Sequence, residues 1–154
     1  MDNKFHERIG KLPDLMQKLE DSKFRTRNEL SEVKYGGIYV FYDPNDLQAL
    51  YVGRSDNIKE RVQRHSRQSS DHGSATFAFI LAKNNAAAEG INISTERKLL
   101  EQNDVFKDKF KAAKTTVSNM LVKVVKEENP IIQILLEVYA AVHLNTPYND
   151  FGNH

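Results

Sequence analysis

The most continuous hydrophobic pattern of the chain lies close to its C-terminal end. Residues 131–144 are almost entirely apolar, and they follow Asn129, a good helix N-cap, and Pro130, which suits the first helical position. The pattern predicts a helix that begins at Pro130. At helical spacing, its broad apolar stripe is expected to face the core and contains Ile131, Ile134, Leu135, Val138, Ala141 and Val142.

Glu137 lies at the edge of this apolar stripe. A carboxylate at the margin of a core is costly unless it is paired with a cation or binds one. Taken alone, the position favours a structural ion pair with one of the 22 lysines and arginines.

Two short runs rich in β-branched and aromatic residues predict an antiparallel hairpin. They are GIYVFY at 37–42 and ALYVG at 49–53, separated by the turn-forming DPNDLQ. A further run predicts a third strand over about 116–125. Alternate residues of a strand share a face, so Tyr39 and Tyr51 can lie on the same side of the hairpin. Packing on the sheet is the ordinary role of such tyrosines.

The remaining hydrophobic positions predict helices before and after the hairpin. Apolar residues from 5 to 19 recur at helical spacing, with a break at Pro13. The sequence TRNE at 26–29 resembles a capping box and predicts a second short helix. IKERVQRHSR predicts a helix from Ile58, directly after the hairpin.

Two more helices are predicted between the hairpin and the third strand. Residues 74–89 are ambiguous between strand and helix, but their length, their alanines and Ser74 as a cap favour a helix. Residues 94–114 predict a highly charged helix, and the apolar residues expected on one of its faces are Leu99, Phe106, Phe110 and Ala113.

Composition is that of an ordinary soluble domain. The 154 residues are 40% hydrophobic and 28% charged, and the absence of cysteine excludes disulfides and thiolate zinc sites. No apolar run approaches the roughly 20 residues of a membrane span, and the first residues lack the apolar centre of a signal peptide. We therefore expect a cytoplasmic protein without a membrane partner. The net charge is only +1, so a nucleic-acid partner would need a local basic patch.

Such a patch is present after the hairpin. Between residues 54 and 67, two acids and His65 accompany five cations, which are Arg54, Lys59, Arg61, Arg64 and Arg67. Arg61 and His65 share one helical face, and guanidinium groups suit phosphate because they contact its oxygens in pairs. A solvated helix face is the alternative. His65 and His72 have no evident third ligand, so zinc is not favoured.

Together, these residues resemble the signature of the GIY-YIG endonucleases. The chain carries GIY at 37–39, YVG at 51–53, Arg61 ten residues after Tyr51, and Glu137 with Asn149 twelve residues later. The pattern is similar to the catalytic domains of the bacterial excision-repair endonuclease and of phage homing endonucleases, with Val52 in place of isoleucine.

The resemblance implies an α/β (α+β) fold with a three-stranded, mainly antiparallel sheet flanked by helices. Residues 1–154 would form a single nuclease domain, with residues 1–33 as an N-terminal helical extension. The chain departs from the compact family core between the Arg61 helix and the third strand, where its additional residues are expected to form a helical insertion.

The resemblance also implies roles for the matching residues. Glu137 would be the sole protein ligand of a divalent metal, Mg²⁺ or Mn²⁺, and one carboxylate suffices because magnesium keeps several waters. Tyr39 or Tyr51 would position and deprotonate the attacking water. The other implied site residues are Arg61 and Arg54 for charge stabilisation, His65 for phosphate contact or proton relay, Asn149 for orientation, and Arg64 and Arg67 for nucleic-acid binding.

The expected function is metal-dependent hydrolysis of phosphodiester bonds in DNA by an endonuclease. RNA stays open as a substrate. The alternative is a catalytically inactive module that keeps the fold to bind nucleic acid or protein. The intact set of residues favours the enzyme.

Overall fold

The computed structural model describes residues 3–93 and 97–152. It divides the chain into two compact units. The first unit comprises Met1–Lys59 and Met120–His154, and the second comprises Glu60–Asn119.

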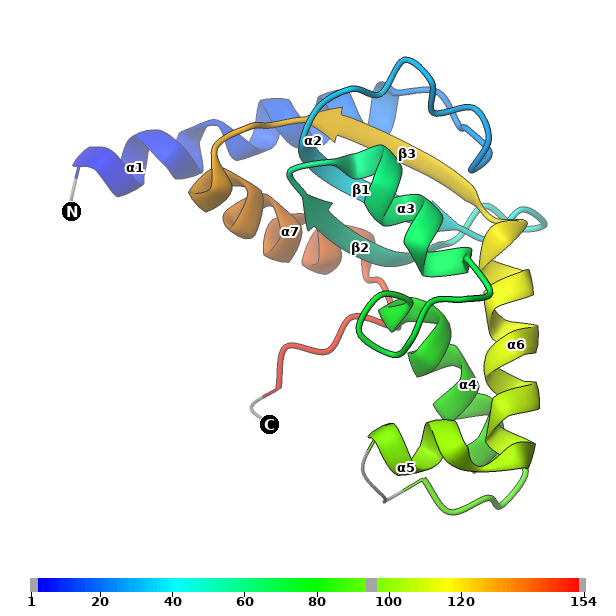
Figure 1. The fold of residues 1–154 in the computed structure, drawn as a ribbon. Helices are drawn as coiled ribbons and strands as arrows, with labels where there is room; N and C mark the ends of the chain where they lie inside the picture. The colour runs from blue at the N-terminus through cyan, green and yellow to red at the C-terminus, as the bar shows by residue number, and fades with distance from the viewer. Residues whose placement is uncertain (1–2, 94–96, 153–154) are drawn as a thin grey trace. The chain divides into compact units, whose positions relative to one another are not determined.

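The centre of the first unit is a three-stranded antiparallel sheet (Figure 1). The strands β1 (Gly37–Tyr42), β2 (Ala49–Ser55) and β3 (Leu121–Lys126) lie in the order β2-β1-β3. All six residues of the central strand are buried. The predicted hairpin and the predicted α+β fold class are confirmed.

The third strand begins later than the sequence pattern predicted. Residues 116–118 belong to a helix that ends at Ser118, and β3 starts only at Leu121. The hydroxyls of Thr115 and Thr116 donate to the carbonyl oxygens four residues earlier, at 3.2 and 3.1 Å. These contacts satisfy the hydroxyls within the helix, and the next residue, Val117, is buried in the helical conformation, so packing and not strand propensity decides the structure here.

Strand register sorts the hairpin side chains between two faces. Tyr39 is paired with Gly53 and Phe41 with Tyr51, so both tyrosines lie on one face, as predicted. The other face carries Ile38 and Val40 and belongs to the main core of the unit.

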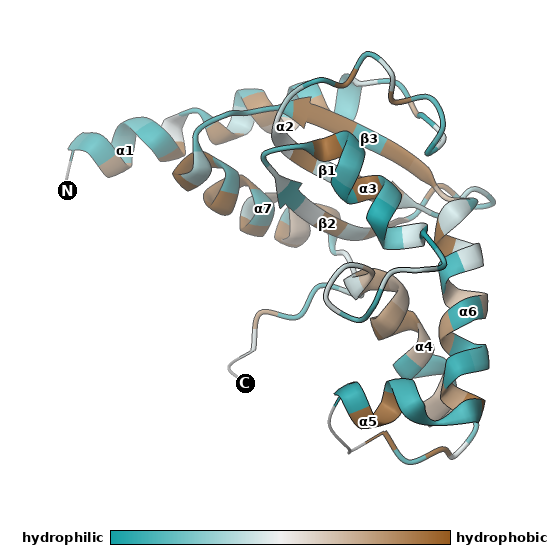
Figure 2. Ribbon diagram, in the orientation of Figure 1, coloured by the Kyte–Doolittle hydropathy of each residue, from teal (hydrophilic) through white to brown (hydrophobic). Residues whose placement is uncertain are grey.

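Two helices cover that second face, α2 (Leu12–Asp21) and α7 (Pro130–Leu144). Figure 2 shows apolar residues along β3 and around α7. Helix α1 (Asn3–Gly10) precedes α2, and Pro13 lies in the first turn of α2, where the break was predicted. The residues that form this core include Leu12, Met16, Leu19, Ile38, Val40, Val52, Ile132, Leu136 and Ala140.

Helix α7 begins as predicted but buries a different side. Asn129 accepts hydrogen bonds from the N–H groups of Ile131 and Ile132, which confirms the N-cap. The predicted core stripe was wrong. Of its members only Ala141 is buried, and the side chains that are 42–73% exposed are Ile131, Ile134, Val138 and Val142. The helix is apolar nearly all round, so its periodicity cannot select the face that meets the sheet.

The segment before β1 contains a turn in place of the predicted short helix. Glu29 accepts from the N–H and the hydroxyl of Thr26, at 3.2 and 2.8 Å, as in a capping box. However, the backbone of Arg25 pairs with Val122 through hydrogen bonds of 2.8 and 2.7 Å. This pairing holds the chain in extended form beside β3, so the capping contact closes a turn and no helix follows.

The second unit consists of helices. It holds most of α3 (Ile58–Ser66), followed by α4 (Thr76–Ala88), α5 (Arg97–Gln102) and α6 (Asp104–Ser118). Edge-to-face aromatic pairs form its core, with ring centroids 5.3 Å apart for Phe79 and Phe106 and 5.6 Å apart for Phe79 and Phe110. The predicted helical insertion is confirmed.

Details of these helices differ from the prediction. Ala75, and not Ser74, occupies the N-cap of α4, without a side-chain cap. The charged segment forms two helices because the side chain of Asn103 accepts from the Phe106 N–H and starts α6. Leu99 is exposed and Leu100 is buried in its place. Residues 94–96 of the predicted helix lie outside the described residues.

No helix in the described part of the chain has both the length and the apolarity of a membrane span.

Candidate active site

The ring of Tyr39 lies across Gly53 on the neighbouring strand. A Cβ atom added at Gly53 would overlap the Cζ and hydroxyl oxygen of Tyr39, which is itself only 1% exposed. Glycine at this position therefore lets the tyrosine extend over β2, the edge strand of the sheet. At Gly37 the close neighbour is backbone, because an added Cβ would overlap the Val125 carbonyl oxygen of β3.

Replacing Gly53 with alanine is expected to displace Tyr39 and to lower the free energy of unfolding by about 1–3 kcal/mol. Urea unfolding of the full chain measures this change. Gly10→Ala is the matched control, because no atom lies within 4 Å of a Cβ added there. A Gly53→Ala protein as stable as the unmodified chain would show that the Tyr39 ring has room to move.

Asn149 attaches the C-terminal segment to β2. Its Oδ1 accepts from the Val52 N–H at 2.8 Å, and its Nδ2 donates to the Val52 carbonyl oxygen at 2.9 Å. The Tyr148 N–H also donates to the Leu50 carbonyl oxygen, at 3.2 Å. Since both backbone groups of Val52 point to Asn149, they point away from β1. Asn149 thus holds the outer edge of the strand that carries Tyr51, which is half-buried.

Thr146, which the sequence pattern did not indicate as a site residue, holds Asn149 in place. Its buried hydroxyl donates to Oδ1 of Asn149 at 2.7 Å. Asn145 ends α7 in the left-handed conformation, with φ 54°, and so turns the chain toward β2. The available signal was a threonine three residues before the asparagine, directly after an apolar helix.

Glu137 and Arg54 lie on the α7 side of the sheet. Arg54 is paired with Ile38, a residue of the core that α7 covers, whereas Tyr39 and Tyr51 lie on the opposite face. Burial raises the pKa of the half-buried Glu137 carboxyl above its usual 4.5, and the charge of Arg54 opposes this rise. Among the described residues, Glu137 forms no ion pair within 4.0 Å.

The structural ion pair that the sequence favoured for Glu137 is therefore absent in the part of the chain that the structure describes. A half-buried carboxylate that lacks a close cation is suited to bind one. Within residues 3–93 and 97–152, no three His, Cys, Asp or Glu side chains form a metal cluster. One carboxylate is enough for magnesium, which retains several of its waters. Glu137 fits the implied metal.

Arg61 belongs to the second unit and holds the loop that precedes α4. One terminal nitrogen, Nη1, donates to the Ser74 and Gly73 carbonyl oxygens at 2.9 and 3.4 Å. The other, Nη2, donates to the Thr76 hydroxyl at 3.3 Å. A guanidinium group has five N–H donors, so these contacts leave donors for a phosphate.

His65 lies one helical turn after Arg61 and is fully buried. Burial, assisted by the charge of Arg61, lowers the pKa of His65 to about 3. The imidazole is therefore neutral near pH 7, and its Nδ1 accepts from the Phe77 N–H at 3.5 Å. In this tautomer Nε2 carries the proton, so His65 can donate a hydrogen bond but cannot act as a cation.

The other two arginines of the patch share one acid. Arg64 Nε lies 3.0 Å from Glu60 Oε1, and Arg67 Nη1 lies 3.6 Å from the same oxygen. All three side chains are exposed by more than a third. Such contacts are weak and can exchange for phosphate oxygens.

Comparison with known protein families places the chain in one of them. The model of the GIY-YIG catalytic domain family matches residues 35–116, more than half of the sequence. The chain belongs to the GIY-YIG family. The match includes both tyrosines and Arg61 of this GIY-YIG protein, and it ends before Glu137 and Asn149. No curated protein and no solved structure is significantly similar to the chain.

Membership of the GIY-YIG family indicates the general activity. GIY-YIG domains are usually nucleases, they act on nucleic acid, and the nucleases generally depend on a divalent metal.

Proposed function

We propose that this GIY-YIG protein is a divalent-metal-dependent endonuclease that hydrolyses phosphodiester bonds in DNA. The observation that carries the proposal is Glu137, a half-buried carboxylate beside Arg54 with no ion pair among the described residues. We further propose that residues 1–154 act as one nuclease domain.

In this proposal Glu137 holds the metal, Mg²⁺ or Mn²⁺. When bound, such an ion polarises the scissile phosphate and stabilises the leaving oxygen. Glu137 must be ionised to bind it, and its raised pKa makes this requirement depend on pH.

The tyrosines and arginines of the chain supply the remaining steps. Tyr51 is more exposed than Tyr39 but lies on the face of the sheet opposite Glu137, so the proposal requires the phosphate to lie at the edge of the sheet, which β2 forms. There Tyr51 positions the attacking water and takes its proton through the phenolic oxygen. A phenol with a pKa near 10 is a weak base at neutral pH, so this role needs nearby cations. Arg54 and Arg61 provide positive charge, which also stabilises the charge that develops on the phosphate.

Four further residues have supporting roles in the proposal. Asn149 positions the strand that carries Tyr51 through both backbone groups of Val52. His65 acts only as a neutral hydrogen-bond donor through Nε2, because burial keeps its imidazole uncharged. Arg64 and Arg67 bind the nucleic-acid backbone outside the reacting phosphate.

Nicking of a supercoiled plasmid tests the function. We expect nicked and linear products with magnesium or manganese and none with an excess of chelator. A catalytically inactive binding module, which the loop contacts of Arg61 favour, would bind the plasmid without nicking it under any of these conditions.

The rate of cleavage is expected to decrease in acid because Glu137 becomes protonated. The pKa of this carboxyl is raised, so the decrease should begin above pH 4.5. Magnesium competes with the proton, so a higher magnesium concentration should move the decrease to lower pH. The measurement is the rate against pH at two magnesium concentrations. An inflection near 6.5 that disappears in His65→Gln would contradict the neutral state of His65.

A further inference from the structure

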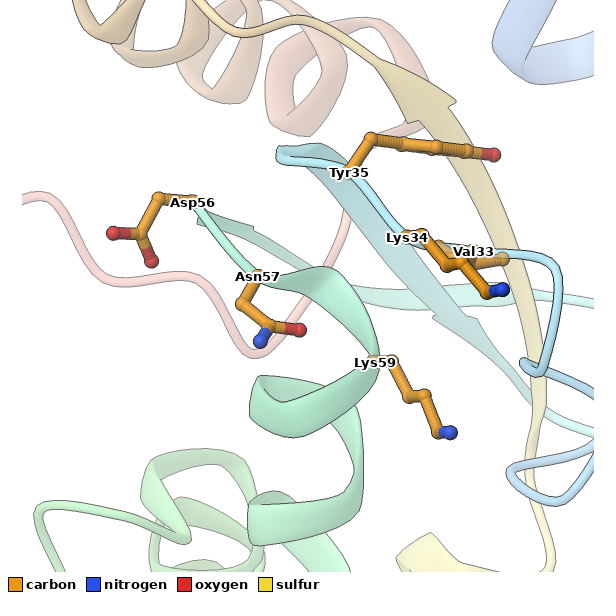
Figure 3. A pocket seen from close by; sticks show the side chains of 6 residues that line it. All are labelled: Val33, Lys34, Tyr35, Asp56, Asn57 and Lys59. Carbon is orange, nitrogen blue, oxygen red and sulfur yellow. The ribbon is translucent and has the colours of Figure 1, made fainter.

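A pocket of about 300 Å³ lies at one end of the sheet in the first unit. Its lining includes Lys34, Tyr35 and Lys59 (Figure 3). Gly37 at the start of β1 is paired with Ser55 at the end of β2, so residues 33–35 and 56–59 meet at this end. The volume is at the small end of the range for ligand pockets and could hold one nucleotide.

The pocket separates its charges. Figure 3 shows the side chains of Lys34, Tyr35 and Lys59 extending to one side, and that of Asp56 extending to the other. Both lysines are exposed, and among the described residues neither ammonium group has an ion pair or hydrogen bond to the protein. Two such cations at one pocket favour an anion of more than one charge or a phosphate chain.

Tyr35 adds an aromatic surface that the backbone holds in place. Its carbonyl oxygen accepts from the Ile58 N–H at 3.2 Å. The carbonyl oxygen of the next residue, Gly36, accepts from the Glu127 N–H at 2.9 Å. The Tyr35 side chain is half-exposed, and the Lys126 ammonium lies 5.9 Å from its ring centroid. An aromatic ring beside lysines is the usual combination for an unpaired nucleotide.

The pocket lies close to the proposed site along the chain. Asp56, which lines the pocket, and Arg54 of the proposed site are two residues apart, so their Cα atoms are separated by at most about 7 Å. At about 3.4 Å of axial length per nucleotide, this distance corresponds to roughly two nucleotides. One strand can therefore reach both places.

We infer that the pocket binds an unpaired nucleotide of the substrate strand, with its phosphate between Lys34 and Lys59 and its base on Tyr35. The inference rests on the proposed nuclease function and names its substrate class, a nucleic acid with a single-stranded segment beside the cleaved bond.

The test measures binding of fluorescein-labelled DNA by the full chain in chelator, where no cleavage occurs. The probes are a blunt duplex and the same duplex with a single-stranded overhang. The Lys34→Ala/Lys59→Ala variant should bind the overhang probe more weakly. Its slope of log affinity against log salt should be smaller by about 0.7, since the contact with one single-strand phosphate is lost. Lys18→Ala/Lys23→Ala makes the same charge change at two exposed lysines elsewhere in this unit and should leave the slope unchanged.

The Tyr35→Leu variant tests the base contact. The link from Ile58 uses the backbone carbonyl of Tyr35, so this variant keeps it. Affinity for the overhang probe should fall roughly 5- to 150-fold, with little change for the blunt duplex. Equal losses for the two probes would overturn the assignment of an unpaired nucleotide.

Other outcomes separate this inference from the proposed function. If the pocket variants match the control while magnesium-dependent nicking persists, the inference is wrong and the nuclease stands. If the unmodified chain neither binds nor cuts DNA, the proposed function is wrong. Loss of affinity for a polyglutamate peptide in place of DNA would assign the pocket to an acidic protein partner and overturn the inference.

Discussion

Glu137→Gln is expected to reduce metal-dependent cleavage by orders of magnitude and to leave the protein folded. The substitution removes the negative charge and nearly preserves the shape, so it affects metal binding more than packing. The measurement is the initial rate of plasmid nicking across a range of magnesium concentrations. Glu32→Gln is the matched control, because Glu32 is an exposed acid of the same unit outside the proposed site, and its cleavage rate should be unchanged.

We also expect Glu137→Gln to change how the stability of the fold depends on pH. A raised pKa means that ionised Glu137 disfavours the folded state. This penalty is absent below about pH 4.5, where the carboxyl is protonated in both states, and is present once the pH exceeds the raised value. Glu137→Gln should therefore be at least as stable as the unmodified chain at pH 7, and any gain should disappear at pH 4. If Glu137→Gln instead destabilises the fold, and the molecules that remain folded cut DNA at the normal rate, Glu137 has a structural role.

Arg61→Ala is expected to lower single-turnover cleavage at saturating substrate by roughly 100- to 1000-fold, with a smaller effect on affinity. A positioned donor matters most when extra charge develops on the phosphate during attack. An exposed backbone contact mainly weakens binding and changes its salt dependence. The measurement is the single-turnover rate against substrate concentration. Arg67→Ala, an exposed arginine paired only loosely with Glu60, is the comparison and should mostly change affinity.

The loop contacts of Arg61 require a second control. Its guanidinium donates to two backbone carbonyls and to Thr76, so alanine could also loosen the loop. Thr76→Val removes one of these contacts and keeps the arginine, so a purely structural role predicts a similar loss of cleavage. Thermal unfolding of both variants reports the fold. Near-normal saturated cleavage by Arg61→Ala would exclude it from the catalytic set.

The sequence by itself determined the elements whose stability is local. The hairpin follows from two β-rich runs around a turn, and α7 begins where Asn129 and Pro130 predict. The common face of Tyr39 and Tyr51 follows from alternation once the hairpin forms. The spacing of the two tyrosines and Arg61 also indicated the GIY-YIG family, because these residues lie within one continuous stretch of the chain.

Only the tertiary structure decided the features that depend on distant partners. The hydrophobic pattern of α7 does not determine which of its sides is buried, because this depends on contact with the sheet. Asn149 reaches Val52 across 97 residues, and the Tyr39 ring reaches Gly53 on the neighbouring strand. Likewise, burial and not residue type keeps His65 neutral. Propensity, capping and alternation act over a few residues, whereas burial, desolvation and hydrogen bonding at a site depend on which segments the fold brings together.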